Sequence, residues 1–406
     1  MFKDFKHPGA LTATLAAAGV LMVVMGIRQS LGLFLGPLNT STGLGLAAIS
    51  FAMAVAQFTW GAIQPLAGAA ADRWGPRPVL LAAIALLALG NAITPHMTSS
   101  WGLIFSQGLL MAIGAGAGSF SVLIGAVAQW LPAQARGTAS GVINAGGSLG
   151  QFVFAPVTQK LIQWLGWIGA LYSLAALSLL ALPLVGKVTP GGRPARYAAN
   201  AAADDGLRAA LRRALGDRSY LLLHAGFFTC GFHIAFLTTH LPTEVNLCGL
   251  PASVASWSLA LIGLSNVVGS LWIGHLVGHH RCKTILALMY GSRAALIGCY
   301  LLMPRQPWVF YAFAIGLGLT WLATVPPTAG LVGKLFGVRY LGTLFGLTLL
   351  SHQTGGFLGA WLGGLAIERL GDYTWMWWAD IALAALAAAL NLPIREAPLQ
   401  RAAVSG

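Results

Sequence analysis

The sequence predicts an all-α membrane protein that crosses the bilayer twelve times. Charged side chains make up 8% of its 406 residues, against about 25% in soluble domains. Hydrophobic residues make up 57% and the mean hydropathy is +0.75, which leaves too little polar surface to cover a water-soluble globule. Twelve helices of about 20 apolar residues with short loops account for the length. The long Leu, Ala, Gly and Ile runs do not alternate in polarity, which excludes an outer-membrane barrel.

Apolar runs between Gly, Pro and charged residues place the spans along the chain. The first six are expected near residues 11–38, 45–71, 79–94, 101–130, 137–164 and 167–186. The second six are expected near 219–245, 252–278, 284–303, 307–335, 340–366 and 373–393. The first apolar run is longer than that of a signal peptide and lacks a clear cleavage site, so we expect it to be an uncleaved span.

The polar stretch between Lys187 and Arg218 divides the spans six and six. We therefore predict an N-terminal six-helix bundle at 1–186, a cytoplasmic linker at 187–218 and a C-terminal six-helix bundle at 219–406. Two interpretations are open for the end of this linker, from Asp205 to Leu215. It forms an amphipathic helix on anionic headgroups, or it is a solvated tether.

The distribution of basic residues predicts the orientation. Of the 23 Lys and Arg residues, all but five fall in segments on one side of the predicted membrane. Lys160, Arg305 and Arg369 fall on the other side, and Arg28 and Arg293 lie within spans. The positive-inside rule then predicts a multi-pass protein of the cytoplasmic (inner) membrane with both termini in the cytoplasm. The net charge of +13 therefore reflects the orientation of the protein in the membrane, and we expect no nucleic-acid partner.

The two halves are related by an internal duplication. An offset of about 205 residues aligns Gly26 with Gly231, Arg28 with His233 and Pro37 with Pro242 without a gap. The first and seventh spans are therefore equivalents, and repeats of this kind are typical of secondary transporters.

The loop between spans two and three reads GAAADRWGPRP, from Gly68 to Pro78. Gly68 permits close helix packing, and Asp72 can counter-charge helix ends and the arginines beside it. This loop resembles the signature of the major facilitator superfamily. The resemblance implies the major facilitator fold, with two pseudo-symmetric six-helix bundles. It also implies that Asp72, Arg73 and Arg77 form a conformational gate and do not touch substrate.

Arg28 is the leading candidate for substrate binding. It lies about 17 residues into the first span, too deep to reach the cytoplasmic surface easily. Spans one to six contain no acidic residue except Asp72, at the far cytoplasmic end, so a partner within this bundle is not expected. A guanidinium matches a carboxylate in a bidentate way, and Gln29 lies next to it. The alternative is a structural pair or a side chain that reaches the outer interface.

Other polar residues in the spans complete the predicted substrate site. His233 is the counterpart of Arg28, and His352, Gln353 and Asn144 lie beside small residues on spans eleven and five. Each of them either lines a cavity or bonds to a neighbouring helix. The sequence leaves both interpretations open.

Three residues are candidates for proton coupling. They are His233, Asp380 and Glu244, because buried ionisable groups in membrane spans are functional candidates by default. The resemblance places spans nine and twelve at the periphery, so Arg293 and Asp380 are expected to be mainly structural. Glu244, at the outer end of span seven, is either a gate contact or part of a solvated loop.

The sequence predicts neither an enzyme nor a cofactor-binding protein. It contains no nucleotide-binding loop or nucleophile–base pair, and GAGAG at Gly114 to Gly118 lies inside an apolar span. The four cysteines have no metal-type spacing, and the loop histidines His275, His279 and His280 lack a completing carboxylate or thiolate, so no metal site is expected.

The segments GIRQSLGLFLGPL and RGTASGVINAGGSLG resemble bacterial members of the monocarboxylate and oxalate/formate transporter group. Members of that group often carry an arginine on span eight, where this chain has Asn266 and Ser270. We predict a secondary active transporter, a monomer in the lipid bilayer, that moves a small organic anion with protons by alternating access. The first alternative is a proton-driven exporter of drugs or metabolites, and the second is a non-transporting membrane sensor or enzyme.

Overall fold

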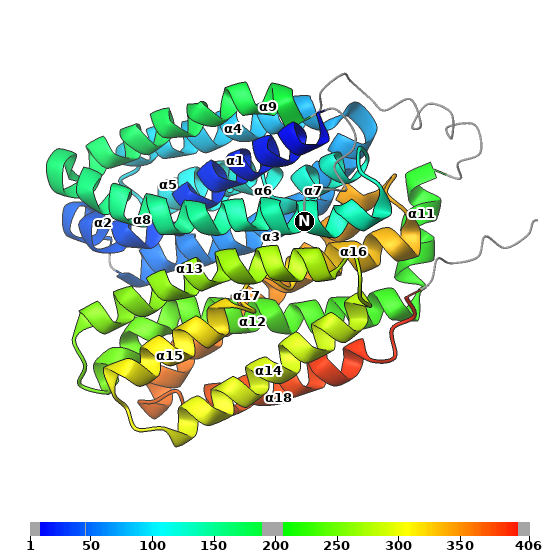
Figure 1. Cartoon of the computed structure of the whole chain (residues 1–406). Coiled ribbons are helices and arrows are strands. Elements are labelled where there is room, and N and C mark those ends of the chain that lie inside the picture. The colour runs from blue at the N-terminus through cyan, green and yellow to red at the C-terminus, as the bar shows by residue number, and fades with distance from the viewer. Residues whose placement is uncertain (1–8, 45, 189–205, 397–406) are drawn as a thin grey trace, which may run out of the picture.

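The computed structural model describes residues 9–44, 46–188 and 206–396, and in these residues the chain runs along one bundle axis twelve times (Figure 1). These runs coincide with the twelve predicted spans within a few residues. Most of the predicted linker, 189–205, lies outside the described residues.

The first half supplies six runs. Their helices are α1 (Ala10–Gln29), η1 (Leu31–Phe34), α2 (Leu35–Thr42), α3 (Leu46–Trp74), α4 (Pro76–Ile93), η2 (Thr94–His96), α5 (Ser100–Leu103), the π-helix η3 (Ile104–Met111), α6 (Ala112–Ala117), α7 (Phe120–Ala128), α8 (Ala133–Ser178), η4 (Leu179–Ala181) and α9 (Leu182–Val188). Helix α8 contains two runs, because Gly166 adopts a φ of +69° and reverses the chain between spans five and six.

The second half repeats this arrangement. Its helices are α11 (Gly206–Leu215), α12 (Arg218–Leu247), α13 (Ala252–Leu276), α14 (Cys282–Leu302), α15 (Pro307–Gly318), α16 (Val325–Phe336), α17 (Leu341–Leu370) and α18 (Thr374–Asn391). The tenth run is interrupted between α15 and α16. Among the described residues, seven helices are by themselves long and apolar enough to cross a membrane.

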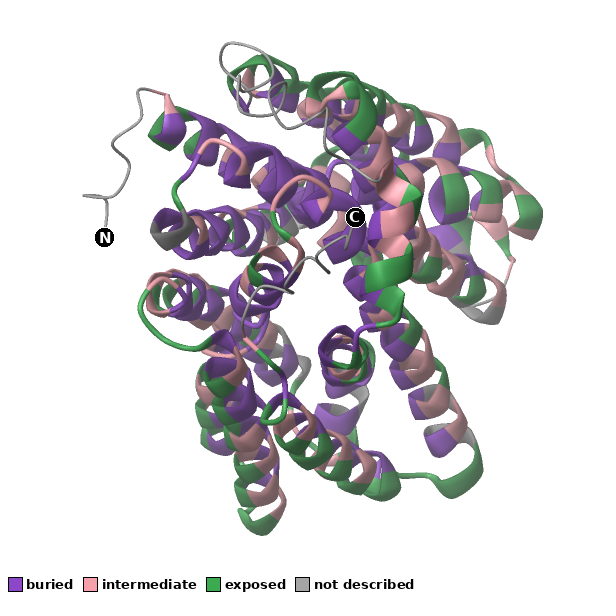
Figure 2. Ribbon diagram, turned by 90° about the vertical axis from the view of Figure 1, so that its right-hand side faces the viewer, coloured by how far each residue is buried: buried purple, intermediate pink, exposed green. Residues whose placement is uncertain are grey.

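The helices form two packed groups that meet along a central interface. In Figure 1, residues 10–188 form the upper group and residues 218–391 the lower one. Helices α3 and α8 of the first group contact α17 and α13 of the second, respectively. Seen along the bundle, buried residues face the interior and exposed residues the periphery (Figure 2), as expected when apolar side chains exclude water or lipid from a core.

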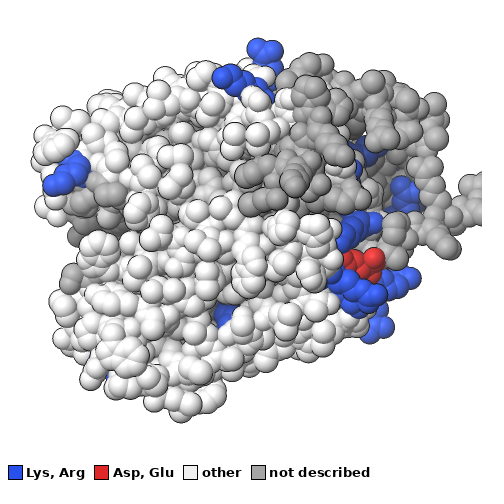
Figure 3. Space-filling model, viewed as in Figure 1, with Lys and Arg blue, Asp and Glu red and all other residues white. Residues whose placement is uncertain are grey.

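One end of the bundle carries most of the basic side chains. We call it the linker-side end, because α9 ends and α11 begins there. In Figure 3 the blue atoms gather at this end, on the right, and the face between the two ends has few. Arg208, Arg212 and Arg213 of α11 are exposed, whereas Ala210 and Ala214 are buried. The predicted amphipathic segment is therefore helical from residue 206.

Glu396 holds the linker-side ends of α14 and α16 together. Its carboxylate accepts hydrogen bonds from the backbone N–H groups of Cys282 and Lys283, at 2.8 and 3.2 Å, and lies 2.6 Å from Lys334 Nζ. Partial burial raises the pKa of this carboxyl, but the bonds from Lys334 and the two N–H groups outweigh it, so the pKa lies below its usual value.

Small residues let the two groups approach closely near the linker-side end. A Cβ on Gly68 of α3 would lie 2.7 Å from the backbone nitrogen of Thr343 on α17, and closer still to the carbonyl group of Gly342. On the other side of the interface, a Cβ on Gly141 of α8 would lie 2.9 Å from the Cα of Gly274 on α13. Helix backbones touch at both places, which only glycine permits.

We expect Gly68→Val to separate the two groups at the linker-side end by about 2 Å, because helix spacing follows the size of the side chains at the contact. Electron-resonance distances between spin labels at Arg77 and Arg281, two exposed positions in opposite groups, measure this separation once Cys248 and Cys299 are replaced by serine. Gly186→Val is the matched control, because nothing lies within 4 Å of a Cβ there. An unchanged distance in Gly68→Val contradicts the assignment of this contact.

Candidate functional site

Arg28 lies in the last turn of α1, and no ion pair joins it to a carboxylate of the described residues. Its guanidinium carbon stacks 4.3 Å from the ring centre of Trp60 on α3. Its Nη2 atom is buried, and none of the described residues offers this nitrogen a hydrogen-bond partner. A cation–π contact stabilises the positive charge but leaves the N–H donors free. Arg28 is therefore a cation with a buried donor, Nη2, that meets no acceptor among the described residues.

The residues around Arg28 hold this part of α1 against α3 and α8. Gly26, about half a turn earlier, lies against α8, where an added Cβ would come within 2.9 Å of the Gly150 carbonyl oxygen. Gln29 donates a long hydrogen bond of 3.5 Å to Gln151 of α8, and both side chains are half-buried. Close helix packing thus fixes the position of the guanidinium.

Gln353 and His352 reach the same interface from the second group. Gly61, next to Trp60, lies against the Gln353 side chain, whose Cγ is 2.6 Å from the position of an added Cβ. His352 Nδ1 lies 3.2 Å from Gln353 Oε1, and the His352 ring packs against Phe227 at a tilt of 53°, with 4.8 Å between the ring centres. Trp60 and its neighbour Gly61 therefore link Arg28 to the pair of polar side chains on α17.

Asn144 lies in a polar network that joins the two groups. Its Nδ2 donates to Ser270 Oγ at 2.8 Å and to the Leu322 carbonyl oxygen at 2.7 Å. Asn266 donates to Ser148 Oγ at 2.5 Å and accepts from the Leu322 backbone N–H at 3.0 Å. The structure therefore places Asn144 in a contact between helices α8 and α13 rather than as a free donor.

His233 and Asp380 form a buried pair in the second group. His233 Nδ1 bonds to Asp380 Oδ2, and both side chains are 0% exposed. The pair joins α12 to α18 and brings together two of the three residues that the sequence marked as candidates for proton coupling. His233 therefore bonds to an internal carboxylate rather than to an open cavity.

Arg293 lies near this pair and is held by backbone carbonyls. Its Nη2 donates to the carbonyl oxygens of Thr320 and Trp321, at 2.8 and 3.2 Å, where the chain is not helical between α15 and α16. Its Nη1 lies 3.6 Å from Cys230 Sγ. Free carbonyls at the interrupted helix thus stabilise a guanidinium that the sequence showed only as an isolated charge. Cys230 and Trp321 gave no signal in the sequence beyond their apolar surroundings.

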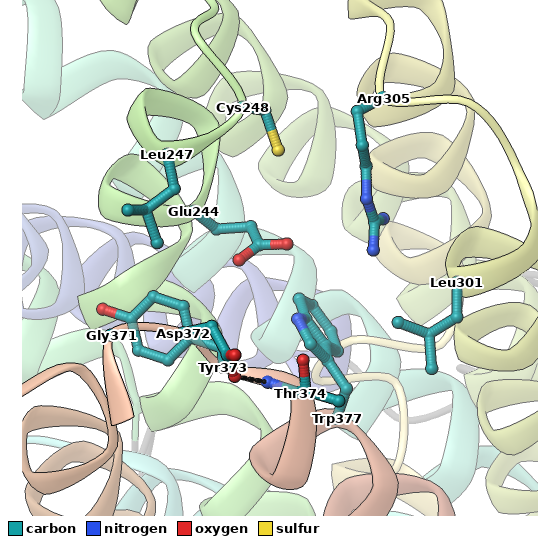
Figure 4. Close-up of a pocket in the computed structure, with 10 residues that line it drawn as sticks. All are labelled: Glu244, Leu247, Cys248, Leu301, Arg305, Gly371, Asp372, Tyr373, Thr374 and Trp377. Atoms are coloured by element: carbon teal, nitrogen blue, oxygen red, sulfur yellow. Dashed lines mark hydrogen bonds between the residues drawn. The ribbon is translucent and has the colours of Figure 1, made fainter. Parts of the chain in front are cut away.

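Glu244 lies at the end of the bundle opposite the linker-side end, in the wall of a cavity of about 300 Å³ (Figure 4). Its carboxylate accepts a hydrogen bond of 3.0 Å from the Tyr300 hydroxyl. In Figure 4 it faces Arg305 across the cavity. Glu244 is only 8% exposed, so it is not part of a freely solvated loop.

Cys248 lines the same cavity, one turn beyond Glu244. Partial burial and the negative charge of Glu244 raise the pKa of the Cys248 thiol, and Arg305 offsets part of this effect. The thiol is therefore protonated at neutral pH.

In the described residues, no group of three or more His, Cys, Asp and Glu side chains has a geometry that could hold a metal ion.

The family of the chain follows from comparison with known proteins. The family model described as Major Facilitator Superfamily matches residues 17–360. The chain belongs to this superfamily.

Relatives of this superfamily member are transporters. It is 27% identical over 365 residues to "Monocarboxylate transporter 13" of Bos taurus, covering 87% of this chain and 81% of that protein. It is 26% identical to "Monocarboxylate transporter 11" of Homo sapiens, covering 88% and 77%. An uncharacterized MFS-type transporter of Bacillus subtilis (strain 168), YcxA, is 21% identical, covering 90% of each chain.

Two solved structures show the same fold. The proton:xylose symporter XylE, solved with 6-bromo-6-deoxy-D-glucose, superposes with a TM-score of 0.74 at 16% identity and covers 94% of each chain. The E. coli fucose:proton symporter FucP superposes with a TM-score of 0.70 at 15% identity, covering 93% of this chain and 97% of that one. These likenesses confirm the predicted twelve-helix major facilitator fold.

The predicted gate residues of this superfamily member lie at the linker-side end. Asp72 Oδ2 accepts hydrogen bonds from the Thr343 backbone N–H at 3.0 Å and from its hydroxyl at 2.7 Å. Arg73 stacks at 5.4 Å on Trp74, and Arg77 is exposed at the start of α4. Asp72 therefore bridges the two groups, because Thr343 lies in the first turn of α17.

We expect Asp72→Ala to loosen the start of α17. Hydrogen bonds to a charged group contribute about 1.5–3 kcal/mol, so amides 341–346 should exchange with deuterium roughly 10–100 times faster. Hydrogen-exchange mass spectrometry of the purified protein measures this change. Asp372→Ala is the control, since Asp372 accepts from the Thr374 backbone N–H at the opposite end of the bundle. Equal protection of 341–346 in wild type and Asp72→Ala would show that Asp72 does not hold the groups together.

Proposed function

We propose that this superfamily member is a secondary active transporter that moves a small organic anion, a monocarboxylate, together with protons across the cytoplasmic membrane. The observation that carries the proposal is the buried Nη2 of Arg28, which has no hydrogen-bond partner among the described residues. A buried charged donor without an acceptor costs several kcal/mol. A carboxylate that accepts from this guanidinium removes that cost, and its bidentate geometry fits.

The surroundings of Arg28 favour an organic acid over an inorganic anion. Trp60 supplies an aromatic surface beside the guanidinium. Gln29 supplies an amide group next to Arg28 in the chain, and Gln353 supplies one at the interface beside Trp60. Ligand sites combine apolar walls with a few polar groups that fix orientation. The names of the relatives given above, which include monocarboxylate transporters, support the same substrate class.

The two groups of helices provide the moving parts. We propose that units 1–186 and 219–406, joined by the cytoplasmic linker 187–218, rock about the interface between them in a monomer. Contacts at Asp72–Thr343 and Asn144–Ser270 join the units from the linker-side end to the middle. These contacts would break when the transporter opens to the cytoplasm, which the positive-inside rule places at the linker-side end.

Coupling to protons is supported by the pair of His233 and Asp380, which is fully buried. A buried ionisable pair in a membrane protein is a functional candidate because it is costly to maintain. The proton gradient would then drive accumulation of the anion.

We expect Arg28→Gln to lower uptake of labelled pyruvate into proteoliposomes by about 10–100-fold, the equivalent of losing one charged hydrogen-bonding contact. Uptake is measured with and without an inward proton gradient, and lactate and an aromatic acid are tested in parallel. The wild type should accumulate at least one of these acids faster with the gradient. Arg369→Gln, at the exposed end of α17, is the matched control and should transport normally.

Two results would count against this proposal. A folded wild-type protein that moves none of the acids would exclude the monocarboxylate class. Uptake by Arg28→Gln at the wild-type rate would show that Arg28 is not the anion ligand.

A further inference from the structure

Helix α12 carries a row of ionisable side chains on one face. Cys230, His233, His240 and Glu244 follow one another at intervals of three, seven and four residues, which places them along a single helix face. Their exposed fractions are 0, 0, 9 and 8%. The side chains packed around them are mostly apolar or aromatic, including Phe232, Phe236, Leu237 and Phe313. A polar row inside such a core is costly and calls for a physical explanation.

A second row of polar side chains begins at the N-terminal end of α18 and runs antiparallel to the row on α12. His240 Nδ1 lies 3.1 Å from the Tyr373 hydroxyl, and His233 bonds to Asp380 one step further into the bundle. Trp377 lies between Tyr373, which caps α18, and Asp380, and it lines the same cavity as Glu244. The two helices therefore form a ladder of paired polar groups, which we call the α12–α18 ladder: Glu244, His240, His233, Tyr373, Trp377 and Asp380.

One end of the ladder opens into the cavity shown in Figure 4. Exposed residues Asp372 and Thr374 form part of the cavity wall, so the cavity reaches the surface. Glu244 lies behind them with its carboxylate directed into the cavity. Protons from water at this end of the bundle thus have a carboxylate at the mouth of the ladder.

The other end of the ladder reaches the interface between the two halves. Cys230 interacts with Arg293 and with His352, and a Cβ on Gly231 would collide with the His352 backbone. His352 is in turn next to Gln353, which lies against Gly61 beside the Trp60–Arg28 stack. The ladder therefore ends where the proposed anion site begins.

Several buried atoms along the ladder lack a hydrogen-bond partner in the described residues. They are Asp380 Oδ1 and His233 Nε2 in the ladder, and Arg293 Nε beside it. Buried polar atoms in proteins are nearly always satisfied by protein or by ordered water. Donors and acceptors that lie one after another can bind water in a chain, and such a chain conducts protons.

We propose that the α12–α18 ladder is the proton path of this transporter, distinct from the path of the substrate. The inference rests on the proposed function, because it concerns the coupling ion of the same transport cycle. A proton from water in the cavity binds the Glu244 carboxylate, passes along His240 and water, and adds to the His233–Asp380 pair. It leaves through His352 to water at the interface, and no other bond is made or broken.

The charges around the pair explain how proton and anion are coupled. Arg293 of α14 is the ionisable group next to the pair. Cys230 of α12, Tyr290 of α14 and His352 of α17 are grouped around Arg293. Asp380 and Arg293 bring formal charges of opposite sign to this cluster, and an added proton makes the cluster more positive. A second positive charge at Arg28 opposes this proton in a low-dielectric interior, and a bound carboxylate removes the opposition. Binding of the anion therefore favours binding of the proton, and binding of the proton favours binding of the anion. Coupling of this kind leads to transport of both in the same direction.

The first test separates proton coupling from substrate binding. Asp380→Asn in proteoliposomes should lose proton-driven pyruvate accumulation at least tenfold but keep exchange of labelled for unlabelled pyruvate, because exchange needs no net proton movement. Glu396→Gln is the control for removal of a carboxylate outside the ladder, and it should keep both activities. Retention of proton-driven accumulation in Asp380→Asn would overturn the proposal, and so would equal loss of both activities in a folded protein.

The second test addresses the route from the cavity. In a Cys299→Ser background, a negatively charged methanethiosulfonate reagent should modify Cys248 in the cavity wall and slow proton-driven uptake several-fold while sparing exchange. Glu244→Gln should have the same effect without reagent. The Cys248→Ser/Cys299→Ser protein should not respond to the reagent. If modification of Cys248 and Glu244→Gln both leave proton-driven uptake unchanged, protons do not enter by this cavity.

A third measurement does not depend on the substrate, so it tests the ladder even if the proposed function fails. Infrared spectra of the purified protein at decreasing pH should show a protonated-carboxyl band that is absent in Asp380→Asn and altered in His233→Asn. A spectrum that is the same in wild type and in both variants would show that the pair does not hold the proton.

Discussion

The cost of a charge in an apolar helix bundle is the constraint on which the site depends. Such a charge persists only with a partner, and the structure meets this requirement in three different ways. Arg293 donates to carbonyl oxygens at the break between α15 and α16. Asp380 bonds to His233. Arg28 has an aromatic surface and no acceptor for its Nη2 among the described residues. An incoming anion can therefore supply the partner that this charge lacks.

The contacts at the interface between the two halves determine how anion binding at Arg28 can change the rest of the protein. Glycine contacts at Gly68 and Gly141 bring helix backbones together, and polar bonds at Asp72 and Asn144 add to them. None of these contacts buries a large side chain, so they can separate at little cost in packing. Two rigid groups joined by an interface of this kind favour rocking over deformation of either group. Trp60 and Gly61 lie at this interface, between Arg28 and the end of the α12–α18 ladder.

The sequence predicted the architecture because the relevant signals are local. Apolar runs and their Gly, Pro and charged breaks give the twelve spans, and even the reversal at Gly166 falls in the gap between predicted spans five and six. The position of Asp72 followed from its loop motif, although its partner Thr343 did not. These features depend on hydropathy and on residues close together in the chain, which a single sequence displays directly.

The pairing of side chains between helices could not be predicted in the same way. His233 and Asp380 are 147 residues apart, and their contact depends on how α12 and α18 rotate about their own axes when they pack. Asn144 illustrates the same difficulty, because cavity lining and interhelical bonding require the same residue type on the same helix. Trp60 gave no signal, since an indole in an apolar span is equally suited to lipid or to a neighbouring helix. The spacing of His233, His240 and Glu244, by seven and four residues, is present in the sequence and matches one face of a helix, but their partners on the other helix are not local to them in the chain.

The central claim is that Arg28 holds the carboxylate of the substrate, and a dipolar distance measured by solid-state NMR tests it most directly. The protein would be labelled with ¹⁵N in its arginine guanidinium groups and loaded with pyruvate labelled with ¹³C at the carboxylate. We predict a direct ¹³C–¹⁵N contact in the wild type that disappears in Arg28→Lys. Bound pyruvate with no such contact, or a contact that persists in Arg28→Lys, would contradict the account.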